Sequence, residues 1–151
     1  MSDDHVNPPT DPFAPPDAGQ ARVHRQYAAL IRIAERHADT PERRRRVENQ
    51  MVLDPHEAVR LVLALAAGAA MPEPDEAPVD TTDLTAALTL LPHVRADLDA
   101  MEIGLLSMAR SRGLTWQAIA FGLGLGTAQA ARQRYERLSG RTQPTAETNE
   151  N

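Results

Sequence analysis

The residues best suited to chemistry lie within residues 113–138, where amide and guanidinium side chains recur at helical spacing. Gln129 and Gln133 can pair with adenine edges, and Arg132 can pair with guanine or with a phosphate. Thr127 and the main-chain amides at a helix N-terminus can hold a further phosphate. The candidate DNA contacts are therefore Thr127, Ala128, Gln129, Arg132, Gln133, Arg134 and Arg137.

Two short helices must position these side chains. The pattern predicts helices over residues 115–123 and 127–138, joined by a tight turn over residues 124–126. Thr115 and Thr127 are suited to cap the two helices, and Gly124 can take the positive φ that a sharp turn needs. This layout is typical of a helix-turn-helix, whose second helix enters the DNA major groove. The alternative is a two-helix unit that docks on protein.

Small and apolar residues recur on one face of each predicted helix and would pack the two helices together. They are Ile119, Ala120, Leu123, Leu125, Ala131, Tyr135 and Leu138. Trp116, the single tryptophan of the chain, has two interpretations. It is either a plug of this small core or a wedge whose indole N–H lies near a phosphate.

The segment over residues 83–138 resembles small helix-turn-helix DNA-binding proteins of actinobacteria, some of which are labelled regulators of a small heat-shock protein gene. The resemblance rests on Thr115-Trp116, on Leu123-Gly124-Leu125, and on Gln129-Ala130-Ala131 followed by Arg134-Tyr135. It implies a helix-turn-helix fold and a transcriptional or nucleoid role. The chain departs from that family at Gly126, Thr127 and Ala128, because the family tends to carry a basic residue before its Gln-Ala-Ala.

Charge is distributed unevenly along the chain. The net charge is −5, yet residues 113–141 carry four arginines against one acid. A local basic patch attracts phosphate even where the total charge is acidic. All 16 basic residues are arginine, which binds phosphate and base edges through two donors at once. A GC-rich genome is the other explanation of that preference.

The sequence offers no converging set of catalytic or metal-binding groups. The five histidines, at positions 5, 24, 37, 56 and 93, include no pair at metal-ligand spacing, and there is no cysteine. Asp97, Asp99 and Glu102 are most simply the solvated face of one helix. We therefore expect no enzyme, no cofactor and no metal site.

The rest of the chain is expected to be helical between two disordered tails, which makes the fold class all-α. Helices are predicted from about Asp17 to Ala38, from Pro41, and after the cap Asp54. Arg43 to Arg46 form either a phosphate-contacting patch or a solvated helix face. The expected domains are a tail (1–17), an N-terminal helical region (18–70), an acidic, proline-rich linker (71–80), a three-helix helix-turn-helix domain (81–140) and a tail (141–151).

Apolar residues repeat along residues 84–108 at spacings of three and four, close to a heptad pattern. They are Leu84, Leu88, Leu91, Val94, Leu98, Met101, Leu105 and Met108. This face packs either on the rest of the chain or on a second subunit. Pro92 is expected to kink the helix or to start a new one.

No apolar run approaches the roughly 18–20 residues that span a membrane, and the acidic N-terminus lacks the hydrophobic core of a secretory signal. We expect a cytoplasmic, nucleoid-associated transcriptional regulator that binds double-stranded DNA as a homodimer. The alternative is an adaptor that docks on a protein of the transcription machinery.

Overall fold

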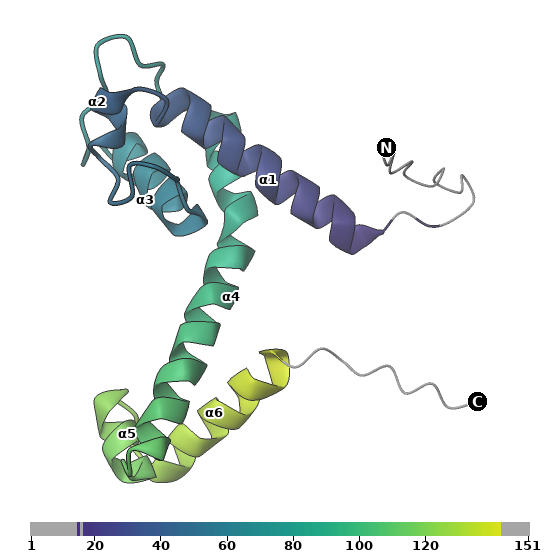
Figure 1. Ribbon diagram of the computed structural model, residues 1–151, viewed down its shortest axis with the longest axis vertical. Coiled ribbons are helices and arrows are strands. Elements are labelled where there is room, and N and C mark those ends of the chain that lie inside the picture. The colour runs from purple at the N-terminus through teal and green to yellow at the C-terminus, as the bar shows by residue number, and fades with distance from the viewer. Residues whose placement is uncertain (1–14, 16, 143–151) are drawn as a thin grey trace, which may run out of the picture. The chain divides into compact units, whose positions relative to one another are not determined.

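The computed structural model describes residue 15 and residues 17–142, and this part of the chain contains helices and no strand. The helices are α1 (Ala18–His37), α2 (Pro41–Arg44), α3 (Pro55–Ala66), α4 (Thr81–Ser111), α5 (Trp116–Gly122) and α6 (Ala128–Thr142) (Figure 1). The all-α prediction is confirmed for these residues. None of the described helices is long and apolar enough to cross a membrane.

The predicted helix starts of the N-terminal region are confirmed. Asp17 caps α1 by accepting hydrogen bonds from the amides of Gly19 (2.9 Å) and Gln20 (3.2 Å). Thr40 and Asp54 cap α2 and α3, each accepting from the amide three residues ahead, at 3.2 and 2.9 Å. Each cap satisfies an amide that has no partner inside its helix. Local sequence is therefore sufficient to fix where these helices begin.

The predicted tails fall largely outside the described residues, since residues 1–14, 16 and 143–151 are not among them. At the C-terminal side, α6 continues through Arg141 and Thr142, which the sequence had assigned to the tail.

The chain divides into two compact units within α4, between Leu90 and Leu91, and not at the expected linker over residues 71–80. α4 is one helix through Pro92, so no new helix starts there. Because proline has no N–H, the Leu88 carbonyl lacks its usual helical partner at this point. The division thus falls where the helix has one hydrogen bond fewer.

The core of unit 1, the residues up to Leu90, lies between α1, α3 and the first turns of α4 (Figure 1). Its buried residues are Ala29, Ile33, Ala58, Val62, Ala86, Ala87 and Leu90. Four of the seven are alanine, so burial of large apolar side chains contributes little here. Hydrogen bonds and ion pairs must therefore do much to fix how the helices of unit 1 pack together.

The segment over residues 71–80 is bound to α1 and to the residues after α2. Glu76 accepts a hydrogen bond from Arg46 Nη2 (2.8 Å) and lies 2.8 Å from His37 Nδ1. Asp80 pairs with Arg32 (2.9 Å) and caps α4 by accepting from the Asp83 amide (2.7 Å). The expected linker is therefore an integral part of unit 1.

In the run from Arg43 to Arg46, Arg44 and Arg45 are exposed, whereas Arg43 is buried and Arg46 is half-buried. The buried Arg43 donates to Asp39 Oδ1 (2.7 Å), and Arg44 donates to a main-chain carbonyl (3.0 Å). Arg46 donates to both carboxylate oxygens of Glu76. Because the chain reverses after α1, Arg43 and Arg46 reach the α1 C-terminus and the acidic segment, where Asp75 and Glu76 neutralise them.

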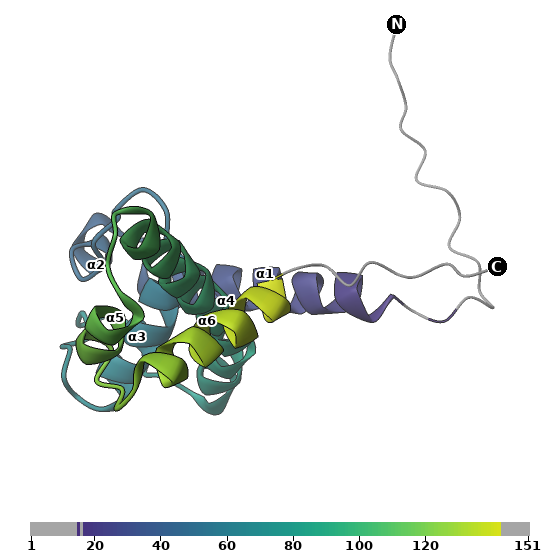
Figure 2. The same cartoon turned by 90° about the horizontal axis from the view of Figure 1, so that it is seen from below.

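The core of unit 2, the residues from Leu91 onward, joins the second half of α4 to α5 and α6 (Figure 2). Leu106, Ile119, Ala120 and Ala131 are buried in it, with Ala109, Trp116, Leu125 and Tyr135 packed around them. The predicted packing residues lie in this core or are buried beside it, as Leu138 is, except for Leu123. Leu123 is 38% exposed because it follows the last residue of α5 and faces away from the core.

Candidate nucleic-acid interface

A glycine turn joins α5 to α6, and its geometry explains the residues found there. Gly124 has a φ of 70°, a value that a side chain would disfavour. The amide of Gly124 donates to the Phe121 carbonyl (3.1 Å), and the amide of Leu125 donates to the Ala120 carbonyl (2.8 Å). These bonds close the end of α5 as in a Schellman-type cap. Leu125 therefore packs against the core, and the chain then continues into α6.

Two threonines start the helices on either side of this region. Thr115 Oγ1 accepts from the Ala118 amide, and Thr127 Oγ1 accepts from the Ala130 amide, both at 3.1 Å. Both predicted caps are confirmed. The Thr127 hydroxyl is thus engaged by its own helix, and the first amides of α6 remain the donors that this helix end can offer to an anion.

The outward face of α6 carries the polar residues that the sequence pattern placed there. Gln129, Arg132, Gln133 and Arg137 are exposed, whereas Ala128 is half-buried at the start of the helix. Ala131 and Leu138, on the opposite face, are buried. Five of the seven predicted contacts are therefore brought together at the surface: Thr127, Gln129, Arg132, Gln133 and Arg137.

Arg134 lies on the inner side of α6 and is engaged by a carboxylate. Its guanidinium donates to both oxygens of Glu102 on α4, with the Nη2–Oε2 bond at 2.9 Å. The hydrogen bonds from Arg134 hold the pKa of Glu102 below its usual range, although burial opposes them. Glu102, which the sequence suggested to be part of a solvated acidic face, therefore holds α6 in its orientation against α4. A second member, Asp99, lies 3.8 Å from Arg141.

Trp116 joins the small core to the charged surface. Its ring centre lies 5.8 Å from that of Tyr135, inside the core of unit 2. The guanidinium carbons of Arg110 and Arg132 lie 5.0 and 5.9 Å from the indole centre, within the range of cation–π attraction. The tryptophan therefore packs against the core and also restrains the side chains of Arg110 and Arg132.

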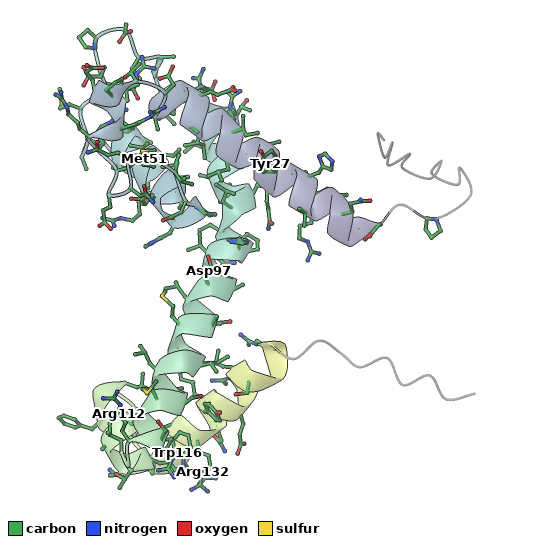
Figure 3. All side chains as sticks on the ribbon, in the orientation of Figure 1. Tyr27, Met51, Asp97, Arg112, Trp116 and Arg132 are labelled. Atoms are coloured by element: carbon green, nitrogen blue, oxygen red, sulfur yellow. The ribbon has the colours of Figure 1, made fainter. Side chains whose placement is uncertain are left out.

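Figure 3 shows Arg112, Trp116 and Arg132 at the end of α4 where unit 2 turns. Unlike Arg134 and Arg141, four other arginines of this region form no ion pair with a carboxylate of a described residue: Arg110, Arg112, Arg132 and Arg137. Arg110 and Arg112 precede the predicted motif and are not among the predicted contacts. Their position three residues and one residue before Gly113, which turns the chain with a φ of 87°, is the signal that could have identified them.

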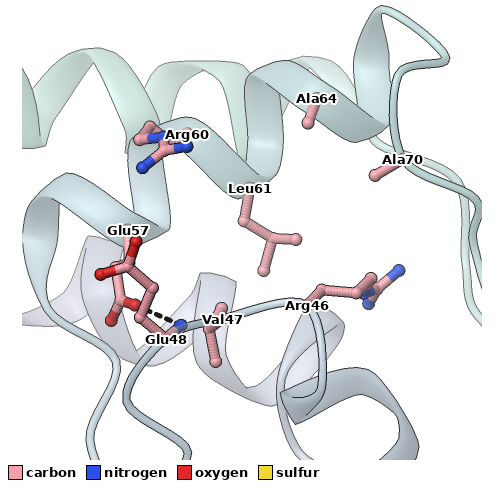
Figure 4. A pocket seen from close by; sticks show the side chains of 8 residues that line it. All are labelled: Arg46, Val47, Glu48, Glu57, Arg60, Leu61, Ala64 and Ala70. Atoms are coloured by element: carbon pink, nitrogen blue, oxygen red, sulfur yellow. Dashed lines mark hydrogen bonds between the residues drawn. The ribbon is translucent and has the colours of Figure 1, made fainter.

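A separate hollow of about 240 Å³ lies in unit 1, between the loop after α2 and α3 (Figure 4). Glu57 on its wall accepts from the amides of Glu48 (2.6 Å) and Asn49 (3.1 Å) through Oε1. Its other oxygen is buried and has no hydrogen-bond partner among the described residues. Glu57 therefore fixes the loop over Glu48 and Asn49 to α3.

Among the described residues, no group of three or more histidines, aspartates or glutamates is arranged to hold a metal ion. Comparisons of the chain with protein-family models, with curated proteins and with solved structures found no match.

Proposed function

We propose that the protein binds double-stranded DNA as a transcriptional regulator, with α5 and α6 acting as a helix-turn-helix. The observation that carries the proposal is the gathering of unpaired arginines around the exposed polar face of α6. Cations that the fold does not neutralise favour an anionic partner. The proposal involves no catalytic step and no cofactor, and it places the protein in the cytoplasm at the nucleoid.

In this proposal α6 is the recognition helix. Gln129 and Gln133 face base edges, and Arg132 contacts guanine or a phosphate from a position that Trp116 restrains. Arg110, Arg112 and Arg137 contact the phosphate backbone, which contributes affinity without sequence preference. Arg134 is a positioning residue, since its donors are occupied by Glu102.

The protein acts as a dimer in this proposal. The outward face of one α6 carries few charges, so one copy binds weakly, and two copies double the number of phosphate contacts. A two-fold dimer also presents two recognition helices to major grooves one DNA turn apart, about 34 Å.

The test is fluorescence anisotropy with labelled duplexes of random sequence, titrated with the full chain at increasing salt. We expect binding that weakens steeply between about 50 and 200 mM salt, as counterion release requires. Arg132→Ala should weaken binding about tenfold or more. Arg25→Ala, which removes an exposed arginine of α1, is the matched control and should change affinity little. If the chain does not bind DNA even at the lowest salt, the proposal is wrong.

A second candidate function is an adaptor that docks on a protein of the transcription machinery. It is favoured by Phe121, an aromatic side chain of α5 that is 87% exposed and that no other described residue covers. Exposed aromatic residues are typical anchors of protein interfaces. Phe121→Ala separates the two functions, because it should leave DNA affinity nearly unchanged and abolish docking on a protein.

A further inference from the structure

One face of α4 in unit 2 remains apolar and uncovered. Leu98, Met101, Leu105 and Met108 are 50, 58, 72 and 53% exposed. We call these four residues the α4 stripe. Leu106 on the same helix is 4% exposed, so the helix buries a different side against α5 and α6. A contiguous apolar patch of this kind on a small protein marks an interaction surface.

Gly104 lies within α4 next to the α4 stripe, and no packing contact among the described residues requires a glycine there. A β-carbon placed on it would meet nothing within 4 Å, and its φ is not positive. Glycine in a helix interior destabilises the helix relative to alanine. It lies one turn from both Met101 and Met108, so its missing side chain leaves room for another backbone to approach this face.

We propose that the α4 stripe is the surface on which a second copy of this chain docks, with the two α4 helices antiparallel and crossing near Gly104. The spacing of the stripe is three, four and three residues, which is the same in both chain directions. A two-fold axis between Met101 and Leu105 therefore sets Leu98 on Met108 of the partner subunit, and Met101 on Leu105 of the partner subunit. These positions are the a and d sites of a heptad, which interdigitate between paired helices.

Charge selects the antiparallel orientation. Residues 91–102 of α4 carry three carboxylates and one arginine, and two of these carboxylates, Asp99 and Glu102, lie near Arg141 and Arg134 of their own chain. Residues 103–111 carry Arg110 and no acid. Antiparallel helices set each acidic half beside the basic half of the other copy, whereas parallel helices set like charges together. Asp97 is available for this contact, because its side chain is 60% exposed and pairs only with His93 (3.4 Å) among the described residues.

This surface rests on the dimer that the proposed function includes, and it is compatible with it. In such a pair the two Ser111 residues lie on the order of 24 Å apart, at a rise of 1.5 Å per residue from the axis. In each copy α5 and α6 come directly after Ser111. This distance is therefore compatible with two recognition helices placed about 34 Å apart, the spacing of adjacent major grooves on one face of DNA.

The first experiment measures the mass of the full chain in solution by sedimentation equilibrium, without DNA. We expect twice the chain mass of 16.5 kDa. Leu105→Asp should return the mass to that of one chain, with the helical circular dichroism unchanged because Leu105 is exposed. Leu63→Asp is the matched control, since Leu63 is 65% exposed on α3, and it should leave the dimer intact. One chain mass at high protein concentration overturns the proposal.

The second experiment tests the orientation by disulfide crosslinking, which is clean because the chain has no cysteine of its own. Gly104→Cys should crosslink with itself. Leu98→Cys and Met108→Cys should crosslink with each other when mixed, and each much less with itself. Efficient self-crosslinking of Leu98→Cys without the mixed product would overturn the antiparallel arrangement. Both experiments omit DNA, so a dimer that fails to bind DNA contradicts only the proposed function.

Discussion

Two groups of arginines, one in each unit, carry the same side chain and meet opposite surroundings. In unit 1, Arg32, Arg36, Arg43 and Arg46 all pair with carboxylates. In unit 2, Arg110, Arg112, Arg132 and Arg137 pair with none of the described carboxylates. A basic run in the sequence is therefore not by itself a sign of nucleic-acid binding. What matters is whether the fold supplies the counter-charge.

The pairing in unit 1 is organised by two fully buried carboxylates, Glu76 and Asp83. Asp83 Oδ1 accepts from Arg32 and Arg36, both at 2.9 Å, and Asp83 Oδ2 lies 3.2 Å from His37 Nε2. Burial by itself raises the pKa of Asp83, but hydrogen bonds from the Asp80 amide, His37 and Arg36 outweigh it, and the pKa is lowered. Such groups are stable as ions only while all partners stay in place.

The largest effect is expected from removing a central carboxylate of unit 1. Asp83→Asn should lower the free energy of unfolding by about 3 kcal/mol, because Arg32 and Arg36 lose their buried partner and keep only the half-exposed Asp80. Urea denaturation followed by circular dichroism measures this change. Asp97→Asn, which alters an exposed acid of the same helix, is the control and should have little effect. Equal effects of the two substitutions would mean that the buried network contributes no stability.

Lowering the pH should disrupt the same network of buried ion pairs in unit 1. Burial raises the pKa of Glu76, but hydrogen bonds from Arg46, the Glu73 amide and His37 overcome this and lower the pKa from 4.5 to about 2. Because the folded pKa is depressed, the contribution is complete above about pH 4.5 and is lost as the pH falls towards 2. It is on the order of 3 kcal/mol. Urea midpoints between pH 6 and pH 2.5 measure it.

Glu76→Gln is the control for the acid experiment. The variant should be less stable than the wild type at pH 6 and should lose less further stability on acidification, since it has no carboxyl to protonate at this position. A pH dependence as steep as that of the wild type would show that other groups cause the acid response.

Replacing one arginine of each group by alanine should affect DNA binding in one unit and stability in the other. Arg110→Ala should reduce the slope of log affinity for DNA against log salt by about one, since one phosphate contact is lost. Its stability should change little. Arg36→Ala should do the reverse and lower stability while leaving the salt slope unchanged, because Asp83 already neutralises this side chain. If both variants reduced the salt slope equally, the distinction between the two groups would fail.

The smallest effect is expected at Arg134, which joins α6 to α4 through Glu102. This pair is partly exposed, so Arg134→Ala should cost about 1 kcal/mol or less. DNA affinity should fall less than with Arg132→Ala. A double-mutant cycle with Glu102→Gln isolates the pair, and strictly additive effects would show that the two side chains do not interact.

Much of the fold was predictable because its signals are local. The caps at Asp17, Thr40, Asp54, Thr115 and Thr127 each act on an amide within three residues. The candidate interface was partly predictable for the same reason, since helical periodicity alone places Gln129, Arg132 and Gln133 on one face. It also places Arg134 about 200° from Arg132, on the side of α6 that faces α4 and Glu102.

Neighbours along the chain are enough to set which segments are helical, where most helices begin and that a glycine turn joins α5 to α6, because capping and turn formation are local. Which arginines meet a carboxylate depends instead on how the helices pack. The partners of Arg46 and Arg134 lie 30 and 32 residues away. The packing also decides which apolar residues stay uncovered, because burial depends on the helix that lies opposite, and for the α4 stripe no such helix is present among the described residues of the chain.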